Sequence, residues 1–186
     1  MNTFFAKETL PEGYAAAQKI DLVSNRKQML LVNGLALLLT VVLVVMGMLL
    51  QPDGKLFDLE ENPFRTAFKC LAIIAGIFAY IAGHEAIHGV FMWHFSHLKP
   101  TFGFSFTYAY AGSSCYFAKN AYLTIALAPV VIWTVLLGVL NVCVPADWFW
   151  VIWAIQIMNI SGAAGDFYVF SACFTLRRRY WCRIPV

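Results

Sequence analysis

Residues 70–90 read CLAIIAGIFAYIAGHEAIHGV, an apolar run that carries three ionisable side chains within five residues. On a helix, His84 and His88 lie four residues apart and therefore share one face. That spacing lets two imidazoles bind one Zn²⁺, and Glu85 between them can act as general base on the attacking water. Ionisable groups inside a membrane segment are costly and mark functional sites. The pattern therefore favours a metal site over a purely structural polar cluster.

The composition around this motif is that of an integral membrane protein. Of the 186 residues, 61% are hydrophobic and only 12% are charged, whereas soluble domains are about half apolar and about a quarter charged. The length suits a single domain, 1–186. The net charge of +3 comes without the basic, aromatic-rich runs of a nucleic-acid binder, so no nucleic-acid partner is expected. The five cysteines are scattered and form no CxxC pair, which favours free thiols.

Four apolar stretches are long enough to cross a bilayer and predict a mainly α-helical bundle of four transmembrane helices. They follow a polar lead at 1–28 and cover 29–50, 67–95, 121–144 and 148–176. With four spans, ten Lys and Arg residues fall on the side that holds both termini, and three fall on the other side. Because cytoplasmic segments carry the excess of Lys and Arg, both termini are expected in the cytoplasm.

The segment 101–118 differs from the spans because its aromatic residues alternate with small or polar ones. This period of two is typical of a strand, with Phe104, Phe106 and Tyr108 on one face. With a turn at 112–114 and a short return strand after it, the segment predicts a small β-hairpin on the cytoplasmic side. Its edge could receive a substrate, which these aromatic side chains would help to position. The alternative is an aromatic loop that only seals the bundle at the membrane interface.

A catalytic zinc site commonly takes three protein ligands, so the two histidines need a partner. His94 is unsuitable, because on a continuing helix it points away from the face that the two histidines share. No glutamate follows Glu85 in the chain. The remaining downstream acids are Asp147, in an outer loop, and Asp166, inside the last span.

Asp166 is expected at the depth of the histidines. It lies 18 residues after Trp148, where the last span enters, and His84 lies 18 residues after Thr66, which is about 27 Å along an ideal helix. The small residues at 161–165 either allow close helix packing or break the helix and aim Asp166 at the metal. We favour the break, because an unpaired Asp there would be costly. Asn159, about two turns earlier, could orient a substrate or bond between helices.

Five short motifs give the chain a recognisable layout: LPEGY at 10–14, IDL at 20–22, HEAIHG at 84–89, LAP at 127–129 and SGAAGD at 161–166. In this layout it resembles the bacterial multi-pass membrane proteins grouped as putative zincin peptidases. It is also similar to a minimal site-2 protease, with HExxH on one membrane helix and an Asp on a later one. The resemblance implies His84, His88 and Asp166 as zinc ligands, Glu85 as general base, and cleavage of a membrane-anchored substrate.

We therefore expect a zinc-dependent metallopeptidase in a bacterial cell membrane, acting on a membrane protein or peptide. The alternative is a non-enzymatic membrane protein that binds or senses a metal at the same residues. A site closed by four protein ligands would favour that alternative, and a site with an open position would favour the enzyme. A transporter is disfavoured, because four spans without internal repeats provide little pathway.

Overall fold

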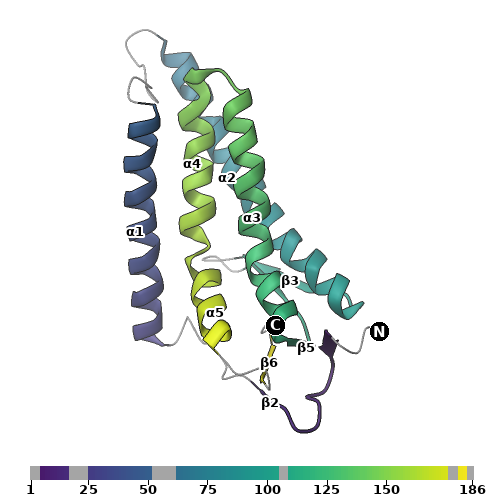
Figure 1. The fold of residues 1–186 in the computed structure, drawn as a ribbon. Coiled ribbons are helices and arrows are strands. Elements are labelled where there is room, and N and C mark those ends of the chain that lie inside the picture. Colours follow the sequence, from purple (N-terminus) through teal and green to yellow (C-terminus); the bar gives the residue numbers. More distant parts are fainter. Residues whose placement is uncertain (1–4, 17–24, 52–61, 105–108, 176–179, 184–186) are drawn as a thin grey trace. The chain divides into compact units, whose positions relative to one another are not determined.

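A computed structural model of the chain describes residues 5–16, 25–51, 62–104, 109–175 and 180–183 (Figure 1). Within them the fold is mainly α-helical, as the sequence predicts. The helices are α1 (Arg26–Leu50), α2 (Pro63–Ser96), α3 (Lys119–Cys143), α4 (Phe149–Gly162) and α5 (Ala164–Thr175), with a short 3-10 helix, η1 (Ala146–Trp148). The strands are β1 (Ala6–Lys7), β2 (Ala15–Ala16), β3 (Thr101–Phe104), β4 (Ala109–Gly112), β5 (Tyr116–Ala118) and β6 (Tyr180–Arg183).

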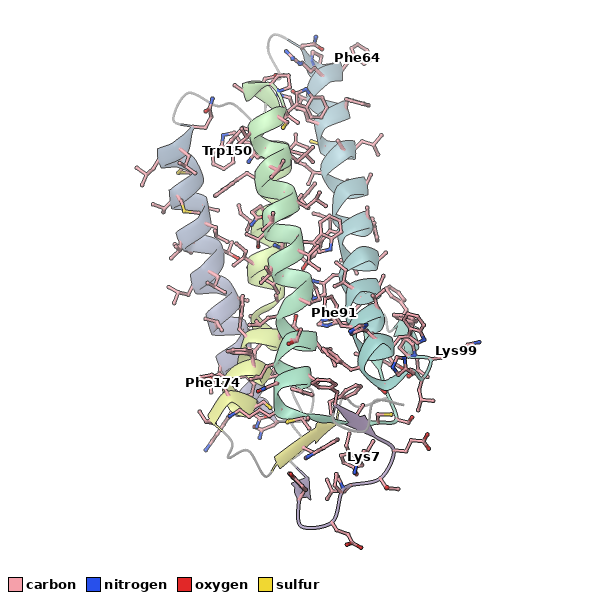
Figure 2. All side chains as sticks on the ribbon, turned by 45° about the vertical axis from the view of Figure 1, so that its right-hand side comes forward. Lys7, Phe64, Phe91, Lys99, Trp150 and Phe174 are labelled. Carbon is pink, nitrogen blue, oxygen red and sulfur yellow. The ribbon has the colours of Figure 1, made fainter. Side chains whose placement is uncertain are left out.

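Three of the described helices are long and apolar enough to cross a membrane. They are α1, α2 and α3, with 25, 34 and 25 residues. Along α1 the side chains are mostly hydrocarbon, and many of its large apolar side chains are exposed, as lipid-facing residues are (Figure 2). These helices coincide, within a few residues at each end, with the predicted spans 29–50, 67–95 and 121–144.

Two shorter helices occupy the fourth predicted span, 148–176. Because α4 has 14 residues and α5 has 12, neither alone reaches the about 20 residues that a bilayer requires. They separate at Ala163, whose N–H bonds to the carbonyl of Ser161 instead of continuing the α-helical ladder. The predicted break among the small residues is therefore present.

The chain divides into two compact units. The first comprises residues 1–29, 82–129 and 165–186, and the second comprises 30–81 and 130–164.

The second unit is built from helices that pack closely. A Cβ at Gly47 of α1 would overlap the indole of Trp153 in α4, and this indole N–H donates to the carbonyl of Leu43 at 3.0 Å. Glycine therefore allows α1 and α4 to approach. Asp147 forms ion pairs with Arg65 and with the buried Lys69. The buried apolar cluster consists of Tyr80, Leu137, Ile152 and Ile155.

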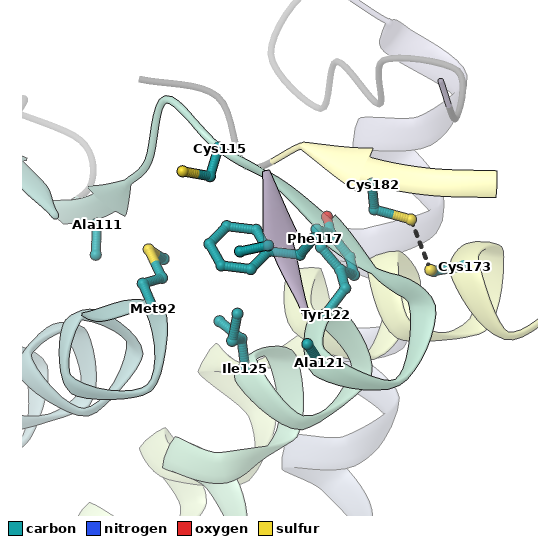
Figure 3. Packing of buried hydrophobic residues seen from close by; sticks show 10 residues of the cluster. Met92, Ala111, Cys115, Phe117, Ala121, Tyr122, Ile125, Cys173 and Cys182 are labelled. Carbon is teal, nitrogen blue, oxygen red and sulfur yellow. Dashed lines mark hydrogen bonds between the residues drawn. The ribbon is translucent and has the colours of Figure 1, made fainter. Parts of the chain in front are cut away.

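The first unit contains a four-stranded sheet in the order β1-β5-β6-β2. Strand β5 runs antiparallel to β1 and β6, and β2 runs parallel to β6. The sheet thus joins strands from both ends of the chain. Phe117 of β5 is fully buried in a core to which α2, α3 and α5 also contribute (Figure 3). That core comprises Ala6, Met92, Ala111, Cys115, Phe117, Ala121, Tyr122, Ile125, Cys173 and Cys182.

The first unit also contains the antiparallel pair β3–β4, but the predicted position of its turn is wrong. Thr101 lies opposite Gly112 and Phe104 opposite Ala109, so the chain reverses before 112–114. The residues after that point form β5, which pairs with β1 and β6 instead of β3. Such long-range partners leave no local sequence pattern. The connection at 105–108 lies outside the described residues, and the side of the membrane on which this pair lies stays a prediction.

Candidate metal and catalytic site

Two histidines on α2 form the centre of the candidate site, which lies within the first unit. The rings of His84 and His88 are one helical turn apart, with centroids separated by 4.9 Å and planes at 79°. Both residues are buried. Burying two imidazoles among apolar groups is costly unless their nitrogen atoms have partners.

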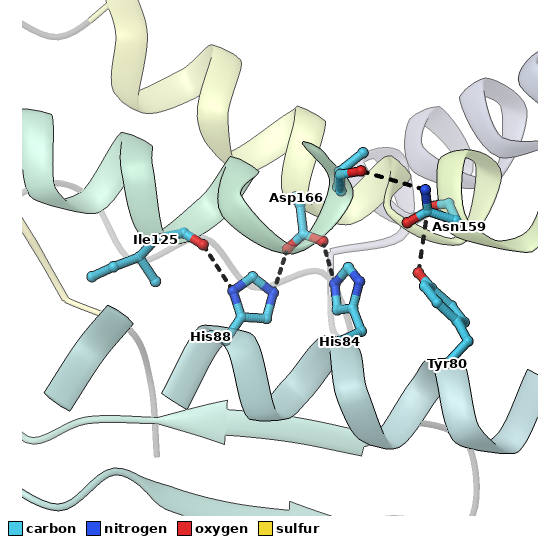
Figure 4. Close-up of polar contacts among 7 residues, drawn as sticks. Tyr80, His84, His88, Ile125, Asn159 and Asp166 are labelled. Atoms are coloured by element: carbon cyan, nitrogen blue, oxygen red, sulfur yellow. Dashed lines mark hydrogen bonds and ion pairs between the residues drawn. The ribbon is translucent and has the colours of Figure 1, made fainter. Parts of the chain in front are cut away.

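Asp166 is the partner that the two histidines share. Its Oδ2 lies 3.1 Å from His84 Nε2, and its Oδ1 lies 3.5 Å from His88 Nε2 (Figure 4). The helix break at Ala163 places Asp166 in the first turn of α5, where the helix N-terminus favours a negative charge. The structure thus brings together the three residues that the sequence predicts as metal ligands.

The other ring nitrogen of His88 is held by the backbone of α3. His88 Nδ1 lies 2.9 Å from the carbonyl oxygen of Ile125. A carbonyl oxygen can only accept, so Nδ1 carries the proton and donates it. In the neutral ring, Nε2 then directs its lone pair toward Asp166.

Glu85 lies beside this pair and contacts the small sheet. Its carboxylate accepts a hydrogen bond from the backbone N–H of Ala111 in β4. A carboxylate oxygen of Glu85 and one ring nitrogen from each histidine lie within 4.8 Å of one another. Two carboxylates therefore approach the histidines, and Asp166 is the one that contacts both Nε2 atoms.

Gly89 allows β3 to pack against α2 next to the motif. A Cβ at this position would overlap the ring of Phe102 and press against Pro100. Phe102 is paired with Ala111 across the two-stranded sheet. The glycine that ends HEAIHG therefore leaves room for the sheet whose second strand reaches Glu85.

A family model matches residues 77–180, which is 104 of the 186 residues. The family is described as putative zincin peptidase. The chain belongs to this family. Zincins are zinc metallopeptidases that use an HExxH helix, and the matched range contains both the HExxH residues and Asp166. No curated protein and no solved structure matches the chain.

The residues predicted to position a substrate have different surroundings. Asn159 belongs to the second unit, where its Nδ2 donates to Thr134 Oγ1 at 2.9 Å and to the carbonyl of Val130 at 3.4 Å. These contacts correspond to the alternative of a bond between helices. Phe104 is 79% exposed at the end of β3. Phe106 and Tyr108 lie outside the described residues.

Two backbone groups of the site were not predicted from the sequence. They are the carbonyl of Ile125, which holds His88, and the N–H of Ala111, which holds Glu85. Neither residue type carries a chemical signal of its own. For Ile125, the available signal is the proline four residues later, at Pro129.

Proposed function

We propose that the chain is a zinc-dependent membrane metallopeptidase that hydrolyses a peptide bond within or next to the bilayer. The observation that carries the proposal is the shared contact of Asp166 with the Nε2 atoms of both HExxH histidines. Membership of the zincin peptidase family supports the peptidase chemistry. The three long apolar helices support the membrane location.

The donor atoms at the site suit zinc. Imidazole nitrogen and carboxylate oxygen are usual zinc donors, and two donors about 2.0–2.1 Å from a tetrahedral zinc lie roughly 3.3 Å apart. The N···O distances of 3.1 and 3.5 Å fall on either side of that value. In the neutral ring, the His88 Nε2 lone pair also faces an Asp166 oxygen, an arrangement that a shared cation would stabilise. We therefore assign His84, His88 and Asp166 as ligands.

Zinc held there would supply a Lewis acid that activates a water and polarises the scissile carbonyl. Glu85 takes the proton from the attacking water at a carboxylate oxygen and later donates it to the leaving amine. The Ala111 N–H keeps the Glu85 side chain beside the histidines. The three assigned ligands would leave the fourth position of a tetrahedral site open, which favours a catalytic site over a closed structural one.

The two-stranded sheet supports an extended peptide as the class of substrate. In an antiparallel strand, the N–H and C=O of one residue point to the same side. Because the Ala111 N–H contacts Glu85, we infer that the edge of β4 away from β3 lies toward this carboxylate. An unwound segment of a membrane protein or peptide could add along this edge through backbone hydrogen bonds. Its scissile bond would then pass near Glu85.

We also propose that α4 and α5 together form a fourth crossing of a bacterial cell membrane. Residues 149–175 would then span the bilayer despite the break at Ala163, since irregular backbone is tolerated at membrane depth where protein surrounds it. Both termini would be cytoplasmic, on the distribution of ten Lys and Arg residues against three.

The test compares Glu85→Gln with Glu12→Gln, a matched change at an exposed glutamate. Hydrolysis of β-casein in detergent micelles and zinc content are measured for both variants and for the wild type. Glu85→Gln should keep its zinc and lose at least about a hundredfold in rate, the usual contribution of a general base. Glu12→Gln should match the wild type. Wild-type activity in Glu85→Gln would refute the mechanism.

A further inference from the structure

Helix α3 contains a proline in its interior, Pro129. It belongs to the first unit, as the candidate site does. Proline has no backbone N–H, so it cannot donate to the carbonyl four residues earlier. That carbonyl belongs to Ile125, and both side chains are fully buried. A buried carbonyl without its helical donor needs another partner.

The partner is His88. Its Nδ1 donates to the Ile125 carbonyl oxygen at 2.9 Å (Figure 4). The ring of proline also crowds the carbonyl of residue i−4, which favours turning this oxygen away from the axis of α3. Pro129 therefore removes the helical N–H that would compete for the Ile125 carbonyl and makes this oxygen available to His88.

A second carbonyl of α3 provides an internal comparison. The carbonyl of Val130 accepts from Asn159 Nδ2, but the residue four positions later, Thr134, has a backbone N–H available for the helical bond. That side-chain contact measures 3.4 Å, against 2.9 Å at Ile125. The shorter contact occurs where the helical donor is missing, as competition for the carbonyl predicts.

We propose that Pro129 is a positioning residue for the metal site, acting through the Ile125 carbonyl on His88. By leaving that oxygen free, it fixes the proton of His88 on Nδ1 and directs the Nε2 lone pair toward Asp166. This inference rests on the proposed zinc site. Partners of the non-ligating nitrogen of a metal-binding histidine typically change metal affinity 10–100-fold. We expect the low end, about tenfold, because a carbonyl oxygen has two lone pairs and can still accept weakly from His88 when a helical donor returns.

The test introduces a backbone N–H at position 129 and replaces the proline ring with an apolar side chain of similar size. Pro129→Val supplies the N–H, and the same side chain introduced as its α-hydroxy acid gives an ester without the N–H. Val130→Ala is a control for lost packing in the same helix. Zinc affinity is measured by competition with a chelator. The tautomer of His88 is read in the metal-free protein, at alkaline pH, by ¹⁵N NMR of the four labelled histidines.

Pro129→Val should bind zinc about tenfold more weakly, and its His88 should shift away from the Nδ1–H tautomer. The ester variant and Val130→Ala should stay close to the wild type in both measurements. Equal weakening by Pro129→Val and the ester would assign the effect to the shape of the proline ring and overturn the inference. An unchanged tautomer and affinity in Pro129→Val would overturn it as well. A wild type that binds no zinc would instead refute the proposed function, and the tautomer would still report on Pro129.

Discussion

Replacing Asp166 by asparagine should remove a metal ligand and leave the shape of the site nearly unchanged. Asp166 reaches the Nε2 atoms of both histidines. His88 already uses Nδ1 to bond the Ile125 carbonyl, so a carboxylate at its Nε2 lies where a metal would bind. A residue that only orients a ligand would contact the other nitrogen. We therefore assign Asp166 to the proposed zinc site as a ligand, and its loss should exceed the effect of an orienting partner.

The expected magnitude follows from that distinction. Orienting partners change metal affinity 10–100-fold, so loss of a charged ligand should weaken zinc binding by more than about a hundredfold, or about 2.8 kcal/mol at 1.4 kcal/mol per tenfold. Zinc affinity of Asp166→Asn is measured by chelator competition in detergent. Asp147→Asn is the control, because Asp147 pairs with Arg65 and Lys69 in the second unit. A loss below about tenfold in Asp166→Asn, with its fold intact by circular dichroism, would refute the assignment.

Three further results are expected. Asn159→Ala should lower the free energy of unfolding by about 1–2 kcal/mol in mixed micelles, because it removes the buried amide that bonds to Thr134. A loss of peptidase activity with unchanged stability would instead assign Asn159 to substrate positioning. Cys182 should react with a maleimide at about pH 8 far more slowly than the exposed Cys143. A hydrogen bond with Cys173 and then burial raise the pKa of the Cys182 thiol, which reduces its thiolate fraction. Equal labelling rates of the two cysteines by mass spectrometry would contradict this. A cysteine introduced at Phe57, in a Cys143→Ala background, should react with an impermeant maleimide from outside intact cells; labelling only after permeabilisation would overturn the four-span topology.

The helices and the acidic and basic residues of the site could be predicted because each has a local or chemical signal. Apolar length alone predicts α1, α2 and α3. His84 and His88 are visible through helical spacing. Asp166 is visible because a carboxylate inside an apolar span is costly without a partner. The small residues before it predict the break that begins α5.

The pairing of the strands and the backbone contacts of the site could not be predicted in the same way. Strand β5 pairs with β1 and β6, which come from opposite ends of the chain, and no turn between them fixes the register. The Ala111 N–H and the Ile125 carbonyl belong to the backbone, which every residue shares. A missing N–H is the exception, because proline alone removes it. Pro129 could therefore have indicated that the carbonyl of Ile125 is available, but not that His88 is its partner.

The central claim is that His84, His88 and Asp166 hold one zinc ion, and zinc X-ray absorption spectroscopy of the purified protein tests it most directly. The account predicts about one zinc per chain, with two imidazole ligands and oxygen ligands at about 2.0–2.2 Å and no sulfur scattering. The Asp166→Asn variant should release the metal or change the oxygen ligands of the zinc. A zinc–sulfur distance of about 2.3 Å, which would implicate the cysteines, or a shell without imidazole, would contradict the account.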